Sequence, residues 1–146
     1  MVLTLDPVKT KHRAMWALGD YDRVATEVVG GLGPVLVEAA GVRAGERVLD
    51  VAAGSGNASL PAARTGAEVI ATDLTPELLE VGRQRAAAEG LSITWREADA
   101  EHLDVPDDDV DVTLSCIGAM FAPDHATTAR ELLRVCRPGG TMVMAN

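Results

Sequence analysis

The stretch ERVLDVAAGSGNAS, residues 46–59, passes from an apolar run directly into a loop of small residues. Asp50 lies where the two meet, and Gly54 and Gly56 follow it. Glycines after a strand let the backbone approach a ligand closely and start the next helix tightly. Loops of this kind usually bind phosphate, but a fixed carboxylate beside a phosphate is unfavourable. The stretch therefore predicts a strand, a turn and a helix around a ligand that favours glycines and an acid together.

Short apolar runs alternate with helical patterns along the rest of the chain. The runs are typical of strands covered on both faces, and they are residues 47–53, 68–73, 92–97, 110–115 and 141–146. Between them the pattern predicts helices at about 57–65, 76–89 and 124–136. Strand, helix and strand in repetition imply right-handed crossovers and a parallel sheet. The fold class predicted from the pattern is therefore α/β.

Local signals mark several element ends. Thr75 is the expected N-cap of the second helix, with Pro76 at its first position and Gly90 just past its end. The segment RPGG, residues 137–140, cannot continue a helix and is predicted to turn the chain into the last strand.

The N-terminal part of the chain has a different pattern. Residues 7–41 predict two or three short helices, broken by GGLGP at 30–34. We therefore divide the chain into a helical lead segment, residues 1–44, and an α/β core, residues 45–146.

Composition narrows the classes of function. The chain has 146 residues, a formal net charge of -9 and a hydrophobic content of 47%, which fits one globular domain. Without a run of Lys or Arg, this acidity argues against a nucleic-acid partner. No apolar run approaches the roughly 18 residues that cross a bilayer, and no leader pattern begins the chain. Cys116 and Cys136 lack metal-ligand spacing and are expected to be buried thiols in a reducing, cytoplasmic setting.

Acidic residues cluster at the predicted strand ends. Asp50 lies on the first strand, Asp73 ends the second and Asp99 follows the third. Ligands of open α/β sheets bind beyond the carboxyl ends of the strands. Asp73 also lies about 20 residues after the glycines, where nucleotide sites place the carboxylate that binds ribose. These acids predict a ligand that carries a ribose and positive charge.

A dinucleotide matches this pattern poorly. The position three after Gly56 is Ser59 rather than glycine, and Asp50 would lie near a pyrophosphate. S-adenosylmethionine has a ribose, a sulfonium and an ammonium but no phosphate, so it fits the acids better. A nicotinamide-dependent oxidoreductase remains a third and weaker hypothesis.

Four stretches resemble the motifs of class I S-adenosylmethionine-dependent methyltransferases, in order and in spacing. They are VLDVAAGSGNASL, VIATDLTPELLEVGR, WREADAEHLDVPDDDVDVTLSCIGAMF and ELLRVCRPGG. The resemblance runs from Gly45 to Asn146 and is greatest for the ubiquinone/menaquinone-type methyltransferases. It implies a doubly wound, Rossmann-like sheet of strand order 3-2-1-4-5 with helices on both faces.

The resemblance also implies which residues bind the cofactor. The acid of the first motif and the loop behind it would hold the methionine end, the acid acting on the ammonium directly or through water. The acid of the second motif would bind the ribose hydroxyls, and the acid after the third strand the adenine amino group. The implied cofactor-binding residues are Asp50, Ala52, Gly54, Ser55, Gly56, Asn57, Asp73, Leu74, Asp99, Ala100, Glu101 and Ser115.

One position departs from the family pattern. Ala52 stands where these proteins more often carry glycine, which adds a methyl group beside the methionine moiety.

The chemistry of methyl transfer does not identify the catalytic residues. Methyl transfer from a sulfonium needs a general base only for some acceptors. His12, His102 and His125 are available, although each alone is typical of a surface histidine. Tyr21 lies in the lead segment that covers the cofactor in similar enzymes, and we expect it in the pocket.

Two further expectations concern the C-terminal end of the sheet and the methyl acceptor. Proteins of this family normally continue past the fifth strand with two more strands, so the chain is interpreted as C-terminally truncated. Exposed apolar residues on the fifth strand would then favour self-association. The predicted function is transfer of a methyl group to a small-molecule acceptor that the sequence does not identify. The alternative is a nucleotide-binding or interaction module that binds the cofactor without turnover.

Overall fold

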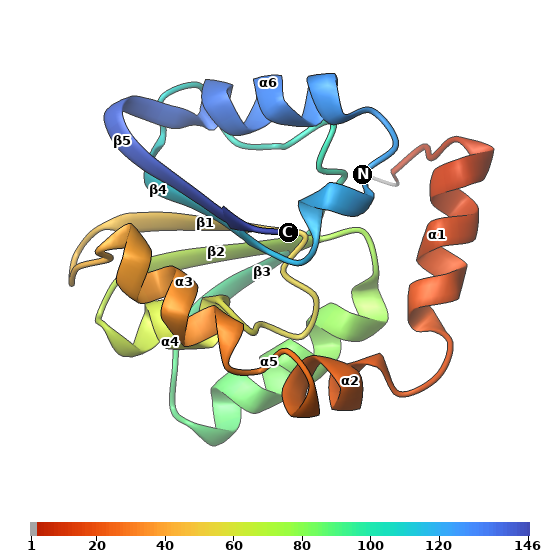
Figure 1. Cartoon of the computed structure of the whole chain (residues 1–146), viewed down its shortest axis with the longest axis horizontal. Helices are drawn as coiled ribbons and strands as arrows, with labels where there is room; N and C mark the ends of the chain where they lie inside the picture. Colours follow the sequence, from red (N-terminus) through yellow and green to blue (C-terminus); the bar gives the residue numbers. More distant parts are fainter. Residues whose placement is uncertain (1–2) are drawn as a thin grey trace.

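Five parallel strands form one sheet in the order β3-β2-β1-β4-β5 (Figure 1). The computed structural model describes residues 3–146. The strands are β1 (Arg47–Val51), β2 (Glu68–Asp73), β3 (Ile93–Glu97), β4 (Val110–Cys116) and β5 (Cys136–Ala145). The chain crosses from β1 outward to β3 and then returns to β4 on the other side of β1. This arrangement confirms the doubly wound, Rossmann-like fold.

Helices cover both faces of the sheet. On one face α3 (Leu32–Ala40) packs against β4 and β5, while α4 (Ser59–Arg64) and α5 (Pro76–Ala88) pack against β2 and β3. On the other face α6 (His125–Val135) packs against β4 and β5. Figure 1 shows the sheet between these two layers. A short 3-10 helix, η1 (Ala119–Phe121), precedes α6.

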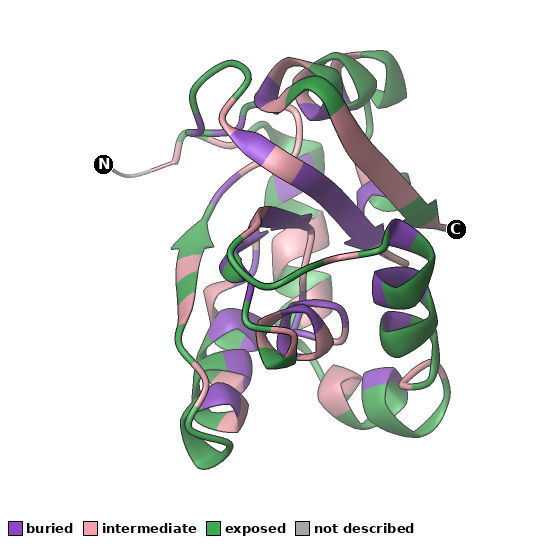
Figure 2. Cartoon of the chain, turned by 90° about the vertical axis from the view of Figure 1, so that its left-hand side faces the viewer, coloured by how far each residue is buried: buried purple, intermediate pink, exposed green. Residues whose placement is uncertain are grey.

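The central strands β1, β2 and β4 are apolar because they bury both of their faces, whereas the edge strands β3 and β5 are partly exposed, which corrects the expectation that all five are covered on both faces. Val48 belongs to the core beneath α3 and α4, and the next residue, Leu49, belongs to the core beneath α6. Both are completely buried. Figure 2 shows the buried residues on the central strands and the exposed residues on the outer sides of the helices. Burial on both faces removes the polar alternation of a half-exposed strand and leaves continuous apolar runs.

The lead segment contains three short helices, which fits the predicted two or three. They are α1 (Pro7–Ala17), α2 (Tyr21–Glu27) and α3. The expected break at 30–34 is partly wrong, because α3 already begins at Leu32. Pro34 is tolerated in its first turn, where the missing N–H has no helical partner. A Cβ on Gly33 would lie 1.8 Å from the carbonyl oxygen of Asn57, so this glycine lets α3 approach the loop after β1.

The RPGG segment is a correction to the predicted turn. β5 begins at Cys136, which pairs with Val110, and regular pairing resumes between Thr141 and Val112. The extra residues between these two pairs form an irregularity within the strand, and Gly139 takes a left-handed φ of 76° there. The segment therefore interrupts the pairing register without ending the strand.

Two other expectations concern the surface. Cys116 and Cys136 are free thiols, each partly buried rather than fully buried. Met144 on β5 is 37% exposed, and self-association through this strand stays a prediction. Within residues 3–146, no helix is long and apolar enough to cross a membrane.

Candidate functional site

A cavity of about 880 Å³, its open mouth included, lies at the carboxyl ends of the strands. Its floor consists of residues 52–55 and 57, after β1, and residues 73–75, at the end of β2. Its wall consists of α1 and α2. The loops after β3 and β4 complete the lining. The cavity is where ligands of open α/β sheets bind.

Eight of the twelve predicted cofactor-binding residues line this cavity, and four do not. The eight are Ala52, Gly54, Ser55, Asn57, Asp73, Leu74, Asp99 and Ala100. The remaining four are Asp50, Gly56, Glu101 and Ser115, which lie behind or beside the lining.

Asp73 joins the two parts of the floor. Its carboxylate accepts hydrogen bonds from the backbone N–H of Gly54, at 2.8 Å, and from that of Thr75, also at 2.8 Å. Thr75 is the N-cap of α5 as predicted, but its own side chain makes no capping bond. Burial raises the pKa of Asp73, while the two backbone N–H groups act in the opposite direction. The carboxylate thus holds the glycine loop against β2 and still borders the cavity.

Asp50 lies beneath the floor. Its side chain accepts a hydrogen bond of 2.5 Å from the Ser59 hydroxyl, and its other carboxylate oxygen, Oδ1, is buried without a partner. Burial is the main cause that raises the pKa of Asp50 to about 7; the hydrogen bonds of Ser59 oppose this shift and the nearby charge of Asp73 adds to it. An acid with one unpartnered buried oxygen is a high-energy group that a nearby cation would stabilise.

Gly56 and Ser115 have structural roles. A Cβ on Gly56 would lie 2.8 Å from the ring of Trp95, so this glycine makes room for a partly buried tryptophan of β3. The hydroxyl of Ser115 donates to the carbonyl oxygen of Val51 and accepts from the backbone N–H of Ala119. Ser115 therefore fastens the loop after β4 to the end of β1.

Backbone strain is concentrated where β1 and β4 end. Ala52 has a φ of 55° and Ile117 a φ of 50°, both in the left-handed region that favours glycine. A Cβ on Gly118 would lie 2.3 Å from the carbonyl oxygen of Ala52. The left-handed backbone at Ala52 gives a conformational reason for the glycine expected at this position. Strained residues of this kind gather at ligand sites, where surrounding structure holds them.

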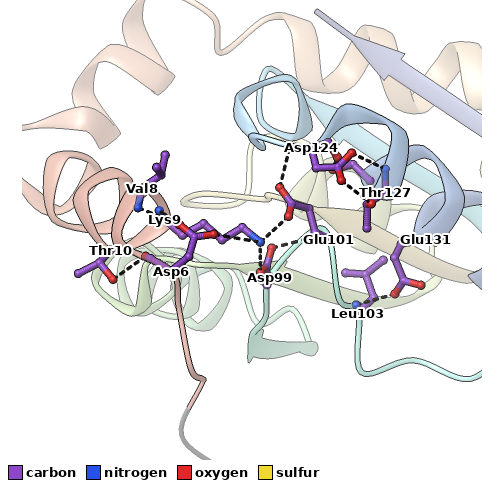
Figure 3. A network of polar contacts seen from close by, with 11 residues as sticks. Asp6, Val8, Lys9, Thr10, Asp99, Glu101, Leu103, Asp124, Thr127 and Glu131 are labelled. Carbon is purple, nitrogen blue, oxygen red and sulfur yellow. Dashed lines mark hydrogen bonds and ion pairs between the residues drawn. The ribbon is translucent and has the colours of Figure 1, made fainter.

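A charged cluster lies at the end of β3 (Figure 3). Lys9 of α1 places its ammonium 2.6 Å from a carboxylate oxygen of Asp99 and 2.5 Å from one of Glu101. The second oxygen of Asp99 accepts from the backbone N–H of Glu101. Glu101 also accepts from the backbone N–H of Asp124, at 2.8 Å. Glu101 is thus committed to contacts inside the protein, whereas Asp99 lines the cavity.

Aromatic rings from α1, α2 and the neighbouring η1 line the same side of the cavity. The chain has only four aromatic residues of the Phe, Trp and Tyr types, and three of them line the cavity: Trp16, Tyr21 and Phe121. The ring of Trp16 lies 5.0 Å from that of Tyr21 and 5.0 Å from that of Phe121, measured between centroids. Tyr21 is where we expected it, and burial and Asp73 raise its pKa. These rings shield the cavity from water on that side.

The sequence reasoning did not find Lys9 or Trp16. Both lie on α1 with His12, and all three line the cavity. Their spacing of three and four residues places them on one helical face, which is a signal that the sequence offered. His12 is the only one of the three histidines that lines the cavity. Burial raises the pKa of Cys116, another lining residue, to about 11, so its thiol stays protonated at neutral pH.

Among residues 3–146, no group of His, Cys, Asp and Glu side chains is arranged to hold a metal ion.

Comparisons with known proteins identify relatives of this chain. An uncharacterized protein of Mycobacterium tuberculosis is 63% identical over 131 residues, which cover 90% of this chain and 48% of that protein. A ubiquinone/menaquinone biosynthesis C-methyltransferase of Azotobacter vinelandii is 34% identical, over 85% of this chain and 53% of its own. The chain thus spans about half the length of the curated relatives it matches.

A solved structure shares the fold. It is a putative S-adenosyl-L-methionine-dependent methyltransferase of Methanococcus maripaludis, with a TM-score of 0.78 and 20% identity, and the match covers 99% of this chain and 67% of that one. The family model described as a methyltransferase domain matches residues 48–140. The protein therefore belongs to this family and is a class I S-adenosylmethionine-dependent methyltransferase domain, related to the ubiquinone/menaquinone methyltransferases.

Proposed function

We propose that the protein binds S-adenosylmethionine in the cavity and transfers its methyl group to a small, largely apolar acceptor. The observation that carries this proposal is the pair of carboxylates, Asp73 and Asp99, which line one cavity from neighbouring strand ends. Family membership implies S-adenosylmethionine as the cofactor. The roles of the individual residues and the acceptor are the parts that we propose.

The cavity residues fit this cofactor. Asp73 would accept hydrogen bonds from the ribose hydroxyls, and Asp99 from the adenine amino group. Asp50 lies beneath the loop that would hold the methionine end, and its unpartnered buried oxygen would be stabilised as a carboxylate by the ligand's ammonium. Among residues 3–146, Lys9 is the only lysine or arginine that lines the cavity, and it is already paired with two carboxylates. That charge distribution favours a cationic ligand over a pyrophosphate.

The protein's part in the reaction is to position the reactants and exclude water. Bound S-adenosylmethionine supplies a methyl group that its sulfonium already activates. The floor would fix the donor through Asp73 and the backbone of residues 52–57. The rings of Trp16, Tyr21 and Phe121 would keep solvent away from the transfer site. Positioning of this kind can supply most of the acceleration for an in-line displacement.

The part of the cavity that we assign to the acceptor is apolar. Trp16, Ile117 and Phe121 line the cavity, and among residues 3–146 the only Asp or Glu residues in the lining are Asp73 and Asp99, which we assign to the cofactor. The relative from Azotobacter is named for ubiquinone and menaquinone biosynthesis. We propose a neutral ring compound as the acceptor. The alternative, cofactor binding without turnover, stays open to test.

Two assays test the proposal. Calorimetric titration should show binding of S-adenosylhomocysteine and no binding of NAD. Incubation with methyl-labelled S-adenosylmethionine and 1-naphthol or 1,4-dihydroxynaphthalene should then place label in the organic phase. Phe121→Ala should lower that transfer, whereas Met120→Ala, on the same short helix but outside the cavity lining, should leave it unchanged. Binding of S-adenosylhomocysteine without transfer to any small molecule of a bacterial extract would support the non-catalytic alternative.

A further inference from the structure

Helix α1 is attached to the rest of the protein mainly through side chains at the cavity. Lys9, His12 and Trp16 point from it into the cavity lining, and Figure 1 shows the helix standing beside the sheet rather than packed on it. Its connection to α2 passes through Gly19, which has a φ of 79° and open space where a Cβ would lie. A segment with few buried contacts and a glycine in its connection is easily displaced.

Lys9 carries the strongest of these attachments. The residue is only 9% exposed, although lysine is almost never buried without a partner. Its ammonium binds Asp99 at 2.6 Å and Glu101 at 2.5 Å. Lys9 and Glu101 are more than ninety positions apart in the sequence. Figure 3 shows both carboxylates directed at the ammonium from the loop after β3.

The same carboxylate belongs to the cofactor subsite proposed above. Asp99 uses one oxygen for Lys9 and the other for the backbone N–H of Glu101. An adenine amino group that reaches Asp99 must therefore arrive at a carboxylate that Lys9 already holds. Glu101 stays bound to the backbone N–H of Asp124 independently of α1, so the acidic side of the contact is fixed and the lysine side can move.

We propose that Lys9 is a latch that closes α1 over the adenine end of the cavity, and that cofactor entry and release require its ion pairs with Asp99 and Glu101 to break. The proposal rests on the proposed function, because it takes S-adenosylmethionine as the ligand. Lys9 thereby controls both the rate at which the cofactor binds and the rate at which it dissociates. A residue that only contacted the bound cofactor would change the dissociation rate alone.

A second ion pair on the same helix provides the matched control. Arg13 binds Glu97 of β3 at 2.6 Å, with both side chains about one third exposed and outside the cavity lining. Exposed pairs contribute little, because water screens them and both side chains lose freedom. Arg13→Met thus removes a cation and an ion pair from α1 without touching the latch.

Stopped-flow mixing with S-adenosylhomocysteine, followed by tryptophan fluorescence, tests the latch. Trp16 reports from the wall, and Trp16→Phe identifies its share of the signal. Lys9→Met should raise both the association and the dissociation rate at least tenfold, whereas Arg13→Met should change each less than threefold. Glu101→Gln, which leaves Asp99 intact, should raise both rates to a smaller extent. Equal effects of Lys9→Met and Arg13→Met, or a faster dissociation with unchanged association, would overturn the proposal.

Hydrogen exchange separates failure of the latch from failure of the proposed function. In the ligand-free protein, Lys9→Met should speed amide exchange over residues 7–17 and leave β1 and β2 unchanged. Unchanged exchange in α1 would overturn the latch even if the cofactor binds. If Lys9→Met speeds amide exchange in α1 as expected but the wild-type protein does not bind S-adenosylhomocysteine, the proposed function is overturned instead.

Discussion

The floor and the wall of the cavity are built by different physical means. The floor is fixed through the backbone, because Asp73 binds two main-chain N–H groups and Gly118 and Gly33 allow close backbone contacts. The wall is fixed through side chains, namely the ion pairs of Lys9 and the ring contacts of Trp16. A backbone-fixed floor keeps one geometry, whereas a wall held by side chains can open. The difference divides the site into a preformed half and an adjustable half.

The largest expected effect comes from the carboxylate that joins the floor. Asp73→Asn keeps the shape of the side chain but removes its charge and one acceptor oxygen. Hydrogen bonds to charged groups contribute on the order of 1.5–3 kcal/mol each, so affinity for S-adenosylhomocysteine should fall at least tenfold. Calorimetric titration measures this change. Unchanged affinity in a folded variant would show that Asp73 serves the loop alone.

Close backbone packing of the floor predicts a large loss of stability on adding one methyl group. Gly118→Ala would place a Cβ 2.3 Å from the carbonyl oxygen of Ala52, and such overpacking costs about 1–3 kcal/mol of unfolding free energy. Gly31→Ala is the control, because its Cβ would meet nothing within 4 Å. Urea denaturation compares the two. Similar midpoints for both variants would mean that the floor tolerates displacement.

Asp50 predicts how stability depends on pH. Because burial raises its pKa from 3.8 to about 7, the folded state binds more protons than the unfolded state between these values. The contribution of this group therefore favours folding at low pH and is lost as pH rises through 7, with a slope of at most about 1.4 kcal/mol per pH unit. Asp50→Asn should remove that slope.

Urea denaturation at several pH values between 4 and 8 measures the slope directly. Identical pH dependence in wild type and Asp50→Asn would place the titration of Asp50 outside this range. Bound S-adenosylhomocysteine, whose ammonium would stabilise the carboxylate, should reduce the slope in the wild type.

The smallest expected effect is a gain. Ala52→Gly relieves a left-handed backbone at φ 55° and should raise the unfolding free energy by up to about 1 kcal/mol, since alanine is unfavourable in this region. Thermal unfolding measures it, and Ala53→Gly on the same loop is the control. A loss of stability in Ala52→Gly equal to that in the control would show that Ala52 is not strained.

The sequence predicted the floor well and the wall poorly, and the difference between them explains why. Strand ends, glycines and acids are local features, so Asp73 and the loop at residues 52–57 could be read from short stretches. Lys9 and Asp99 are ninety positions apart in the sequence and meet only through the tertiary fold, so no short stretch shows their contact. The fold itself followed from the alternation of apolar runs and helical patterns. The turn expected at residues 137–140 is instead an irregularity inside β5, because the strand already pairs with β4 at Cys136 and pairs with it again from Thr141.

A crystal structure with bound S-adenosylhomocysteine tests the central claim most directly. The account predicts that the ribose hydroxyls lie against Asp73, that the adenine amino group lies against Asp99, and that α1 covers the adenine end. A structure in which the ligand lies outside this cavity, or in which Asp73 retains only its bonds to Gly54 and Thr75, would contradict the account.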